Sequence, residues 1–270
     1  MSTEGTSQTI KVTLLVCVVC AVLVSFFSVE LKARQEENKR LDKLKNILSV
    51  ANLIEEGAKA ERINEIFAEN ITPEIIELDD GEKISHDSYK DKLAIENFDD
   101  FDFKNYAKNP KYNRKIPSDK DIANIKKTSQ YMPVYFVKKE GKIEEVILPI
   151  YGKGLWETMY GFIALDKDLN TVKGFTFYQH GETPGLGGEV DNPLWKALWK
   201  DKEVYGDNGS VEIGVVKKGT YDASNPEDKL HKIDGLAGST LTSRAVDRLV
   251  RFWLDDEGYR PFLEKLKKEI

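Results

Sequence analysis

The chain has 270 residues, of which 40% are hydrophobic, and its 40 Lys and Arg against 46 Asp and Glu give a formal net charge of −6 at pH 7. This length suits a membrane anchor with one domain, or two small domains, and the mild acidity argues against a nucleic-acid partner, which needs a basic face. Both cysteines, Cys17 and Cys20, lie in one N-terminal apolar run, so the rest of the chain can form no disulfide and no cysteine-ligated zinc or iron–sulfur site. With three histidines in the whole chain, we predict no metal site.

The apolar run from Val12 to Val29 carries no charge. As a helix, this run spans about 27 Å, which is close to the thickness of the hydrocarbon core of a membrane. A cleaved signal peptide is the competing interpretation, but the preceding segment is nearly neutral, the apolar run is long and no small-residue cleavage site follows. We therefore predict a short tail at 1–11 and an uncleaved transmembrane helix at 12–29. Basic residues after the run outnumber the lone Lys11 before it, which by charge bias favours a cytoplasmic soluble domain.

The segment after the anchor has a helical pattern. Apolar residues recur at three- and four-residue intervals from Leu41 to Ile54, and Gly57 is predicted to end that helix. A second short helix is predicted around Ile63–Phe67. We interpret residues 30–70 as a helical stalk and residues 71–270 as the soluble domain.

The soluble part alternates between strand and helix signals. We predict a strand at 73–78 and then a polar surface excursion over 79–129 with a helix at 118–126. Two hairpins follow, 134–137 with 143–150 and 161–165 with 172–178, then a short helix near Trp195–Trp199, a strand at 211–216, an amphipathic helix at 242–255 and a last helix from Pro261. The expected fold is α+β, a twisted and mainly antiparallel sheet with flanking helices on one side.

Three glycine-bearing segments stand out: 152–156 (GKGLW), 180–188 (HGETPGLGG) and 234–243 (DGLAGSTLTS). The third runs into the start of a predicted helix, where free backbone N–H groups and hydroxyls favour a phosphate. On spacing alone, an ordinary N-cap by Thr242 or Ser243 is the favoured interpretation, because the spacing of a P-loop or a dinucleotide fingerprint is lacking.

The other two segments also leave alternatives open. The second is a stiff turn that can lie flat against a planar ligand or simply connect two elements. His180 and Glu182 could act as acid and base, but without a nucleophile they predict no catalysis. In the first segment, Trp156 either joins the core or stacks on a ring.

Together, the three segments resemble in order and spacing those of the FMN-binding domain family that includes the C subunit of the sodium-translocating NADH:quinone reductase. The resemblance implies that a dedicated flavin transferase takes FMN from FAD and attaches it covalently to Thr240 by a phosphoester. Ala237 and Ser239 depart from the family pattern, which has Ser and Ala there, so Ser239 and Thr242 remain alternative acceptors. The other residues that the resemblance places at the flavin are Gly154, Leu155, Trp156, His180, Glu182, Thr183, Gly185, Leu186, Gly187, Asp234, Gly238 and Leu241.

The resemblance also implies a role. Electrons would arrive from an iron–sulfur centre in the membrane subunits and leave to a second covalent FMN on the B subunit, and the chain alone would not oxidise NADH. It implies a single-pass protein of the bacterial inner membrane with a periplasmic soluble domain, against the charge bias. The alternatives are the G subunit of the ion-pumping ferredoxin–NAD oxidoreductase, a membrane-tethered FMN sensor, and a flavin-free stalk.

Overall fold

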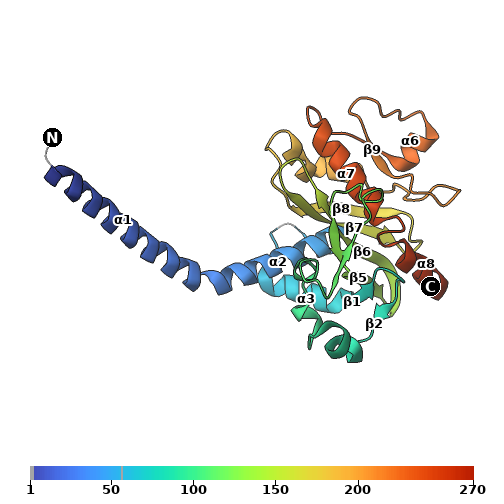
Figure 1. Cartoon of the computed structure of the whole chain (residues 1–270). Helices are drawn as coiled ribbons and strands as arrows, with labels where there is room; N and C mark the ends of the chain where they lie inside the picture. Colours follow the sequence, from blue (N-terminus) through green and yellow to red (C-terminus); the bar gives the residue numbers. More distant parts are fainter. Residues whose placement is uncertain (1–2, 56) are drawn as a thin grey trace. The chain divides into compact units, whose positions relative to one another are not determined.

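The computed structural model of the chain describes residues 3–55 and 57–270 (Figure 1). The chain divides into two compact units, Met1–Lys43 and Leu44–Ile270. The first unit holds α1 (Thr3–Glu30) and the first part of α2 (Lys32–Val50).

Helix α1 contains the predicted membrane span. Within the described part of the chain, its stretch from Gly5 to Glu30 is the one helix long and apolar enough to cross a membrane. Its large apolar side chains are exposed, which suits a surface that faces lipid. The helix begins at Thr3, so it extends into the segment predicted as a tail, because adding residues to a helix already formed costs little.

The second unit is built on a six-stranded sheet in which every pair of neighbours is antiparallel. Both predicted hairpins are confirmed, and positive φ angles at Glu140 (52°) and Gly141 (79°) shape the tight turn of the first. In sheet order the strands are β2 (Lys83–Ile84), β1 (Ile71–Glu77), β5 (Tyr131–Lys139), β6 (Lys142–Lys153), β7 (Thr158–Asp166) and β8 (Val172–Gln179).

One face of the sheet is covered by the end of α2 and by α3 (Ala60–Asn70). The ring of Phe67 packs on Tyr135 at 6.4 Å between centroids. On β8, a Cβ at Gly174 would lie 2.0 Å from the carbonyl oxygen of Val50, so only glycine lets α2 approach this closely. The sequence placed residues 30–70 in a stalk, whereas the residues from Leu44 onward belong to the second unit.

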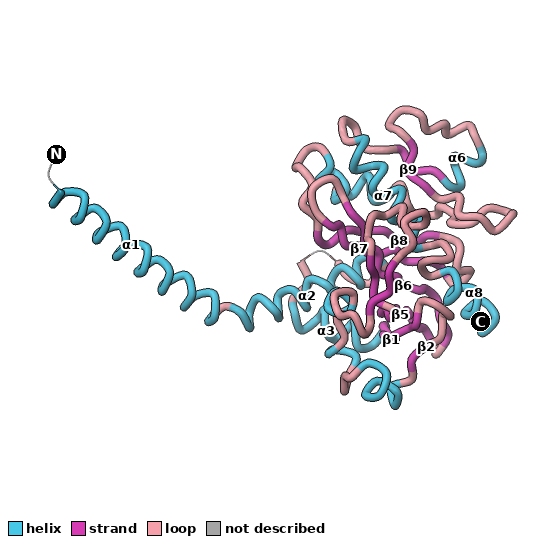
Figure 2. The backbone as a smooth tube through the Cα atoms, in the orientation of Figure 1, coloured by secondary structure: helices cyan, strands magenta, loops and turns pink. Residues whose placement is uncertain are grey.

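The opposite face is covered by α7 (Thr240–Trp253) and α8 (Arg260–Glu269). Phe136, next to Tyr135 and therefore on the other face, lies 6.2 Å from the ring of Phe262. A Cβ at Gly152 would lie 2.7 Å from Cβ of Leu249 on α7. Helices therefore cover both faces, and the prediction of helices on one side is wrong; in Figure 2 the strands run between the α2–α3 pair and α8.

The segment 79–129 is not the surface excursion that we predicted. It contributes buried aromatic side chains to the main core, among them Phe101, Phe103 and Tyr106. The predicted helix at 118–126 is absent, because Asn124 (φ 53°) and Lys126 (φ 67°) adopt left-handed backbone angles that end any helix there. The elements of the segment are β2, η1 (His86–Ser88), η2 (Tyr89–Leu93), η3 (Phe98–Asp100), α4 (Phe103–Tyr106), β3 (Asn113–Lys115) and β4 (Lys127–Ser129).

Among the remaining elements, the predicted ones have shifted bounds, and those at 187–191, 226–231 and 232–234 were not predicted. The first soluble helix ends at Val50 rather than at Gly57, and α7 begins two residues earlier than predicted. The predicted strand at 211–216 is shortened and pairs in parallel with a strand that we did not foresee. These elements are η4 (Gly187–Asp191), α5 (Pro193–Ala197), β9 (Gly214–Val216), α6 (Pro226–His231) and β10 (Lys232–Asp234).

Candidate functional site

The three glycine-bearing segments meet at one buried carboxylate, that of Glu182, whose residue is only 5% exposed. Oε1 accepts hydrogen bonds from the backbone N–H groups of Leu155 (2.8 Å) and Trp156 (3.3 Å). Oε2 accepts one from the Thr242 hydroxyl at 2.5 Å. One side chain therefore ties the loop after β6 and the start of α7 to the loop after β8, although these segments are far apart in sequence.

Two of the glycines are required by this carboxylate. A Cβ at Gly154 would lie 2.6 Å from Oε1 of Glu182. A Cβ at Gly187 would lie 2.7 Å from Oε2 and 2.5 Å from the Thr242 hydroxyl. The close packing around Glu182 thus explains why these positions are glycine.

A cavity of about 230 Å³ opens at this junction, beside the first turn of α7. Ten of the predicted site residues line it: Leu155, Glu182, Thr183, Leu186, Gly187, Gly238, Ser239, Thr240, Leu241 and Thr242. The sequence pattern therefore located a real concavity to which all three segments contribute.

The hydroxyl groups around the cavity differ in accessibility. Thr240, the first residue of α7, is exposed, and its hydroxyl has no hydrogen-bond partner within the described residues. Ser239 is 9% exposed, and Thr242 is 1% exposed with its hydroxyl bonded to Glu182. Thr240 is thus the hydroxyl residue of the three that an incoming group can reach.

The ordinary N-cap is not what the structure shows. The residue at the N-cap position is Ser239, and its side chain makes no capping hydrogen bond. The Ser243 hydroxyl instead bonds the Leu236 N–H (2.9 Å) and the Ser239 carbonyl (3.0 Å). The first N–H groups of α7 therefore receive no cap from the side chain at this position, which leaves them available to an anion.

Two predicted residues hold loops instead of lining the cavity. Nε2 of His180 pairs with Asp191 at 2.7 Å, and its Nδ1 accepts from the Glu182 N–H at 3.2 Å. The carboxylate of Asp234 bonds Lys218 (2.5 Å) and the N–H of Gly219 (3.0 Å). Neither side chain lines the cavity, and each fixes a loop by accepting a hydrogen bond from a backbone N–H.

The other predicted residues outside the cavity lining are Gly154, Trp156 and Gly185. The Trp156 ring is 61% exposed, so it is not part of the core, and its Nε1 donates to the Thr183 hydroxyl at 3.2 Å. Gly185 has a φ of 74°, the left-handed conformation that the turn requires.

A second hollow of about 240 Å³ adjoins the cavity and shares Leu155 and Leu241 with it. It adds three cations that we did not predict, Lys153, Arg244 and Arg248. The signal for the two arginines was the four-residue spacing from Thr240, which places them along one face of α7.

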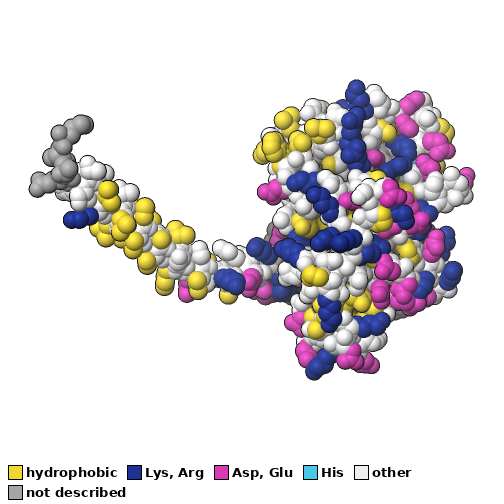
Figure 3. All heavy atoms as spheres, viewed as in Figure 1, with side chains coloured by type: hydrophobic (Ala, Val, Ile, Leu, Met, Phe, Trp, Pro, Cys, Tyr) yellow, Lys and Arg dark blue, Asp and Glu magenta, His cyan; other side chains and the backbone are white. Residues whose placement is uncertain are grey.

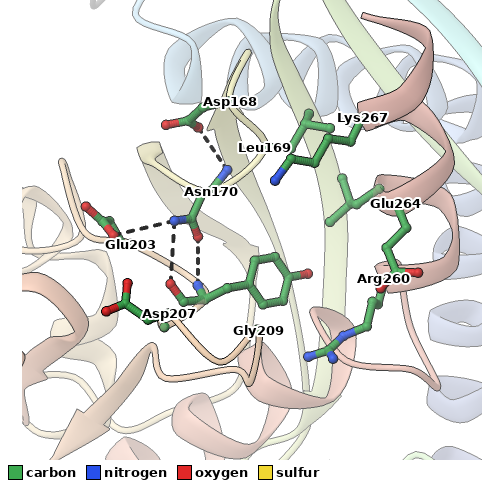
Figure 4. A pocket seen from close by; sticks show the side chains of 12 residues that line it. Asp168, Leu169, Asn170, Glu203, Asp207, Gly209, Arg260, Glu264 and Lys267 are labelled. Atoms are coloured by element: carbon green, nitrogen blue, oxygen red, sulfur yellow. Dashed lines mark hydrogen bonds between the residues drawn. The ribbon is translucent and has the colours of Figure 1, made fainter.

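A further hollow, shown in Figure 4 and about 360 Å³ in volume, is lined by none of the predicted residues. It lies between the β7–β8 turn, the loop at 203–209 and α8, and charged side chains dominate its lining. Several of its polar groups already bond one another; Asn170, for instance, accepts from the Tyr205 N–H at 2.7 Å. Although this hollow is larger than the 230 Å³ cavity, it has little apolar surface against which a flat ring could pack.

Comparison with known proteins identifies the family to which the segments around the 230 Å³ cavity belong. The FMN-binding domain family model matches residues 154–255, a range that contains Glu182, Thr240 and the cavity. The chain therefore carries an FMN-binding domain.

Relatives extend this match over nearly the whole chain. The C subunit of the Na(+)-translocating NADH-quinone reductase of Pseudomonas aeruginosa is 44% identical over 98% of this chain and 97% of that protein. The corresponding C subunit of Yersinia pestis is 39% identical over 98% and 94%. The crystal structure of Shewanella oneidensis NqrC superposes with a TM-score of 0.73 at 35% identity, over 86% of this chain and 99% of that one. The chain belongs to the family formed by the C subunits of Na(+)-translocating NADH-quinone reductases, which confirms the resemblance.

Proposed function

We propose that this chain is the electron-transferring C subunit of a sodium-translocating NADH:quinone reductase, with FMN esterified through its phosphate to Thr240. The observation that carries the attachment site is the exposed Thr240 hydroxyl, which lies on the cavity at the first turn of α7. Family membership supports the parent complex, and the match to the FMN-binding domain supports the cofactor.

The residues at the cavity suit a phosphoester. The unpaired N–H groups at the start of α7 and the positive end of its dipole stabilise negative charge. Gly238, with a φ of 69°, carries no side chain between the loop and the cavity. Ser239 and Thr242 fit less well, since one is buried and the other already bonds Glu182.

The surroundings suit a planar apolar ring. Four apolar side chains of the three glycine-bearing segments are between 45% and 61% exposed: Leu155, Trp156, Leu186 and Leu241. A cluster of exposed apolar side chains marks a surface that a ligand or partner covers. In Figure 3, hydrophobic side chains gather at the upper left of the second unit, over the loops that follow β6 and β8. When bound, FMN supplies reversible electron transfer, while these residues orient it and hold it in place.

Covalent attachment of FMN to Thr240 requires one substitution at the FMN phosphorus of FAD. The Thr240 oxygen forms a bond to the FMN phosphorus of FAD, the bond between the two phosphates breaks, AMP leaves and the hydroxyl proton is lost. A flavin transferase catalyses this step. The contribution of this chain is an accessible hydroxyl on a helix start that stabilises the phosphate charge.

We further propose the partners and the location that the family role implies. The chain exchanges electrons with the iron–sulfur-bearing membrane subunits and with the homologue of the B subunit. It is anchored by α1 in the bacterial inner membrane, and its second unit lies on the periplasmic side. The charge bias around α1 opposes this orientation, but mixed acids follow the anchor and partner subunits can orient a single span.

The attachment site is tested by expressing the full chain with a flavin transferase, beside Thr240→Ala, Thr240→Ser and Ser239→Ala variants. We expect flavin fluorescence on a denaturing gel for the wild-type and Ser239→Ala chains, none for Thr240→Ala, and recovery in Thr240→Ser. A fluorescent Thr240→Ala band would move the bond to Ser239 or Thr242. A dark wild-type band, with the transferase active on a control protein, would refute covalent FMN.

A further inference from the structure

A run of cations borders the flavin cavity without any carboxylate among them. We call it the basic strip and define it as Lys108, Lys126, Lys127, Lys153, Arg244 and Arg248. These residues line two hollows, of about 580 Å³ and 240 Å³, that share Asn124 and Lys153. Within the described part of the chain, no Asp or Glu lines either hollow, although the chain carries a net charge of −6.

The strip has few carboxylates close to it within the fold, although Arg248 acts on the neighbouring Asp247 and opposes the rise that burial causes in the pKa of that carboxyl. Among the residues that the structure describes, none of the six forms an ion pair with a carboxylate, and all six are exposed. Lys104 also lines the larger hollow, but its ammonium lies 3.6 Å from the centroid of Tyr160, so we leave it out of the strip. In Figure 3, Lys and Arg side chains run from the upper edge of the second unit down over the region of α7.

The backbone that presents the strip is held in a defined conformation. The Asp121 carboxylate accepts from the N–H groups of Ile125 and Lys126, both at 2.8 Å. That carboxylate is therefore engaged with the loop itself rather than with the neighbouring ammonium groups. A preorganised charged surface loses less entropy on binding than a flexible one.

The strip continues into exposed apolar surface. Ile122, Leu155 and Leu241 line the smaller hollow with Lys153 and the two arginines and are 44% to 59% exposed. Leu155 and Leu241 also line the flavin cavity. An apolar centre with charged groups around it is the arrangement of a protein–protein interface.

We propose that the basic strip docks an acidic, protruding surface of a redox partner subunit, and thereby places that partner beside the flavin. This inference rests on the proposed function, because a partner docked on the strip lies close to the flavin only if the adjoining cavity binds it. Charge complementarity selects an acidic partner and speeds its encounter. A second copy of the chain is a poor occupant because two basic strips repel, and the strip lies in hollows that a flat bilayer does not fill.

The test uses the full chain, expressed with the other subunits and the flavin transferase. The variant Lys127→Glu/Arg248→Glu reverses two charges of the strip. The control Lys139→Glu/Lys142→Glu makes the same charge change at the exposed β5–β6 turn, whose two lysines line neither the cavity nor the two hollows. The readouts are the partner subunits retained per chain after affinity purification at stepwise NaCl, and the flavin fluorescence per chain.

We expect the strip variant to retain about fivefold less partner than the control at moderate salt, with flavin content unchanged. The milder variant Lys127→Ala/Arg248→Ala, which adds no negative charge, should lose about twofold. Equal retention in strip and control variants overturns the docking proposal, as does a strip variant that keeps its partners but loses binding to phosphatidylglycerol vesicles. A wild-type chain without flavin whose strip variant still loses partners would refute the proposed function and leave the docking surface standing.

Discussion

At the scale of single residues, the geometry of the site depends most on Glu182. Its buried carboxylate makes three hydrogen bonds to three different residues, and two glycines make room for it. Thr240, the residue that we propose to carry the flavin, lies two residues before Thr242, whose hydroxyl donates to Glu182.

We expect Glu182→Ala to lower the free energy of unfolding by about 3 kcal/mol, because it leaves two partly buried N–H groups and one buried hydroxyl without an acceptor. Glu182→Gln keeps the size and one acceptor oxygen and should cost about 1 kcal/mol. Urea unfolding of the full chain in detergent, followed by tryptophan fluorescence, measures both. Similar losses for the two variants would mean that shape rather than hydrogen bonding holds the junction.

At the scale of elements, the end of α2 behaves as part of the second unit. Ile47 and Leu48 are fully buried, and Gly174 permits the contact of α2 with β8. Helix α2 therefore belongs to the second unit from Leu44 onward, and its residues before Leu44 belong to the first unit.

We expect Leu48→Ala to lower the free energy of unfolding of the second unit by about 3 kcal/mol, because it removes buried apolar surface and leaves a cavity. Leu194→Ala makes the same substitution at a residue that is 80% exposed and should change stability by less than about 0.5 kcal/mol. Equal midpoints in a urea titration of the two variants would show that α2 contributes nothing to the unit.

Strand β6 carries a carboxyl, that of Glu145, whose ionisation lowers the stability of the folded chain. Burial raises the pKa of Glu145 from its ordinary 4.5 to about 7, and Asp166 directly opposite on β7 adds to the effect, while Lys173 opposes it. Oε2 of this carboxyl is buried without a hydrogen-bond partner among the described residues. The ionised form is therefore disfavoured in the folded chain.

Since the folded pKa lies above the unfolded one, the stability that this group contributes is present below about pH 4.5 and is lost as the pH rises through about 7. Glu145→Gln removes the ionisation. We expect the variant to match the wild type near pH 5 and to exceed it by about 1 kcal/mol at pH 8.5, a value reduced for the partial exposure of the side chain. Urea unfolding at the two pH values measures the difference, and a difference that does not change with pH would exclude a titration of Glu145.

At the scale of the whole molecule, the chain combines an apolar helix with a compact domain that has an FMN-binding match. The two cysteines of the chain both lie in α1, so a cysteine placed on the second unit is a unique label there.

We expect Lys139→Cys, at the exposed β5–β6 turn, to react with a membrane-impermeant maleimide in cells whose inner membrane is intact, because the second unit is proposed to be periplasmic. The wild-type chain is the control and should remain unlabelled, since Cys17 and Cys20 both lie within the candidate membrane span. Labelling that appears only after the inner membrane is disrupted would place the domain in the cytoplasm, as the charge bias predicts.

Much of this protein was predictable from local sequence. The anchor, both hairpins and helices α7 and α8 follow from apolar periodicity and turn residues, which act between close neighbours in the chain. The three glycine segments, with Thr240 among them, were recognisable because their residue types and spacing carry a family pattern.

Only the tertiary structure decided how these parts meet. The burial of the 79–129 aromatics, the helices on both faces and the junction at Glu182 all rest on contacts between residues far apart in sequence. No local pattern records such contacts, because a polar-looking segment buries its aromatic residues only when a distant sheet offers them a surface. For the same reason, the sequence left three candidate hydroxyls, and the fold distinguished Thr240 by burying the other two.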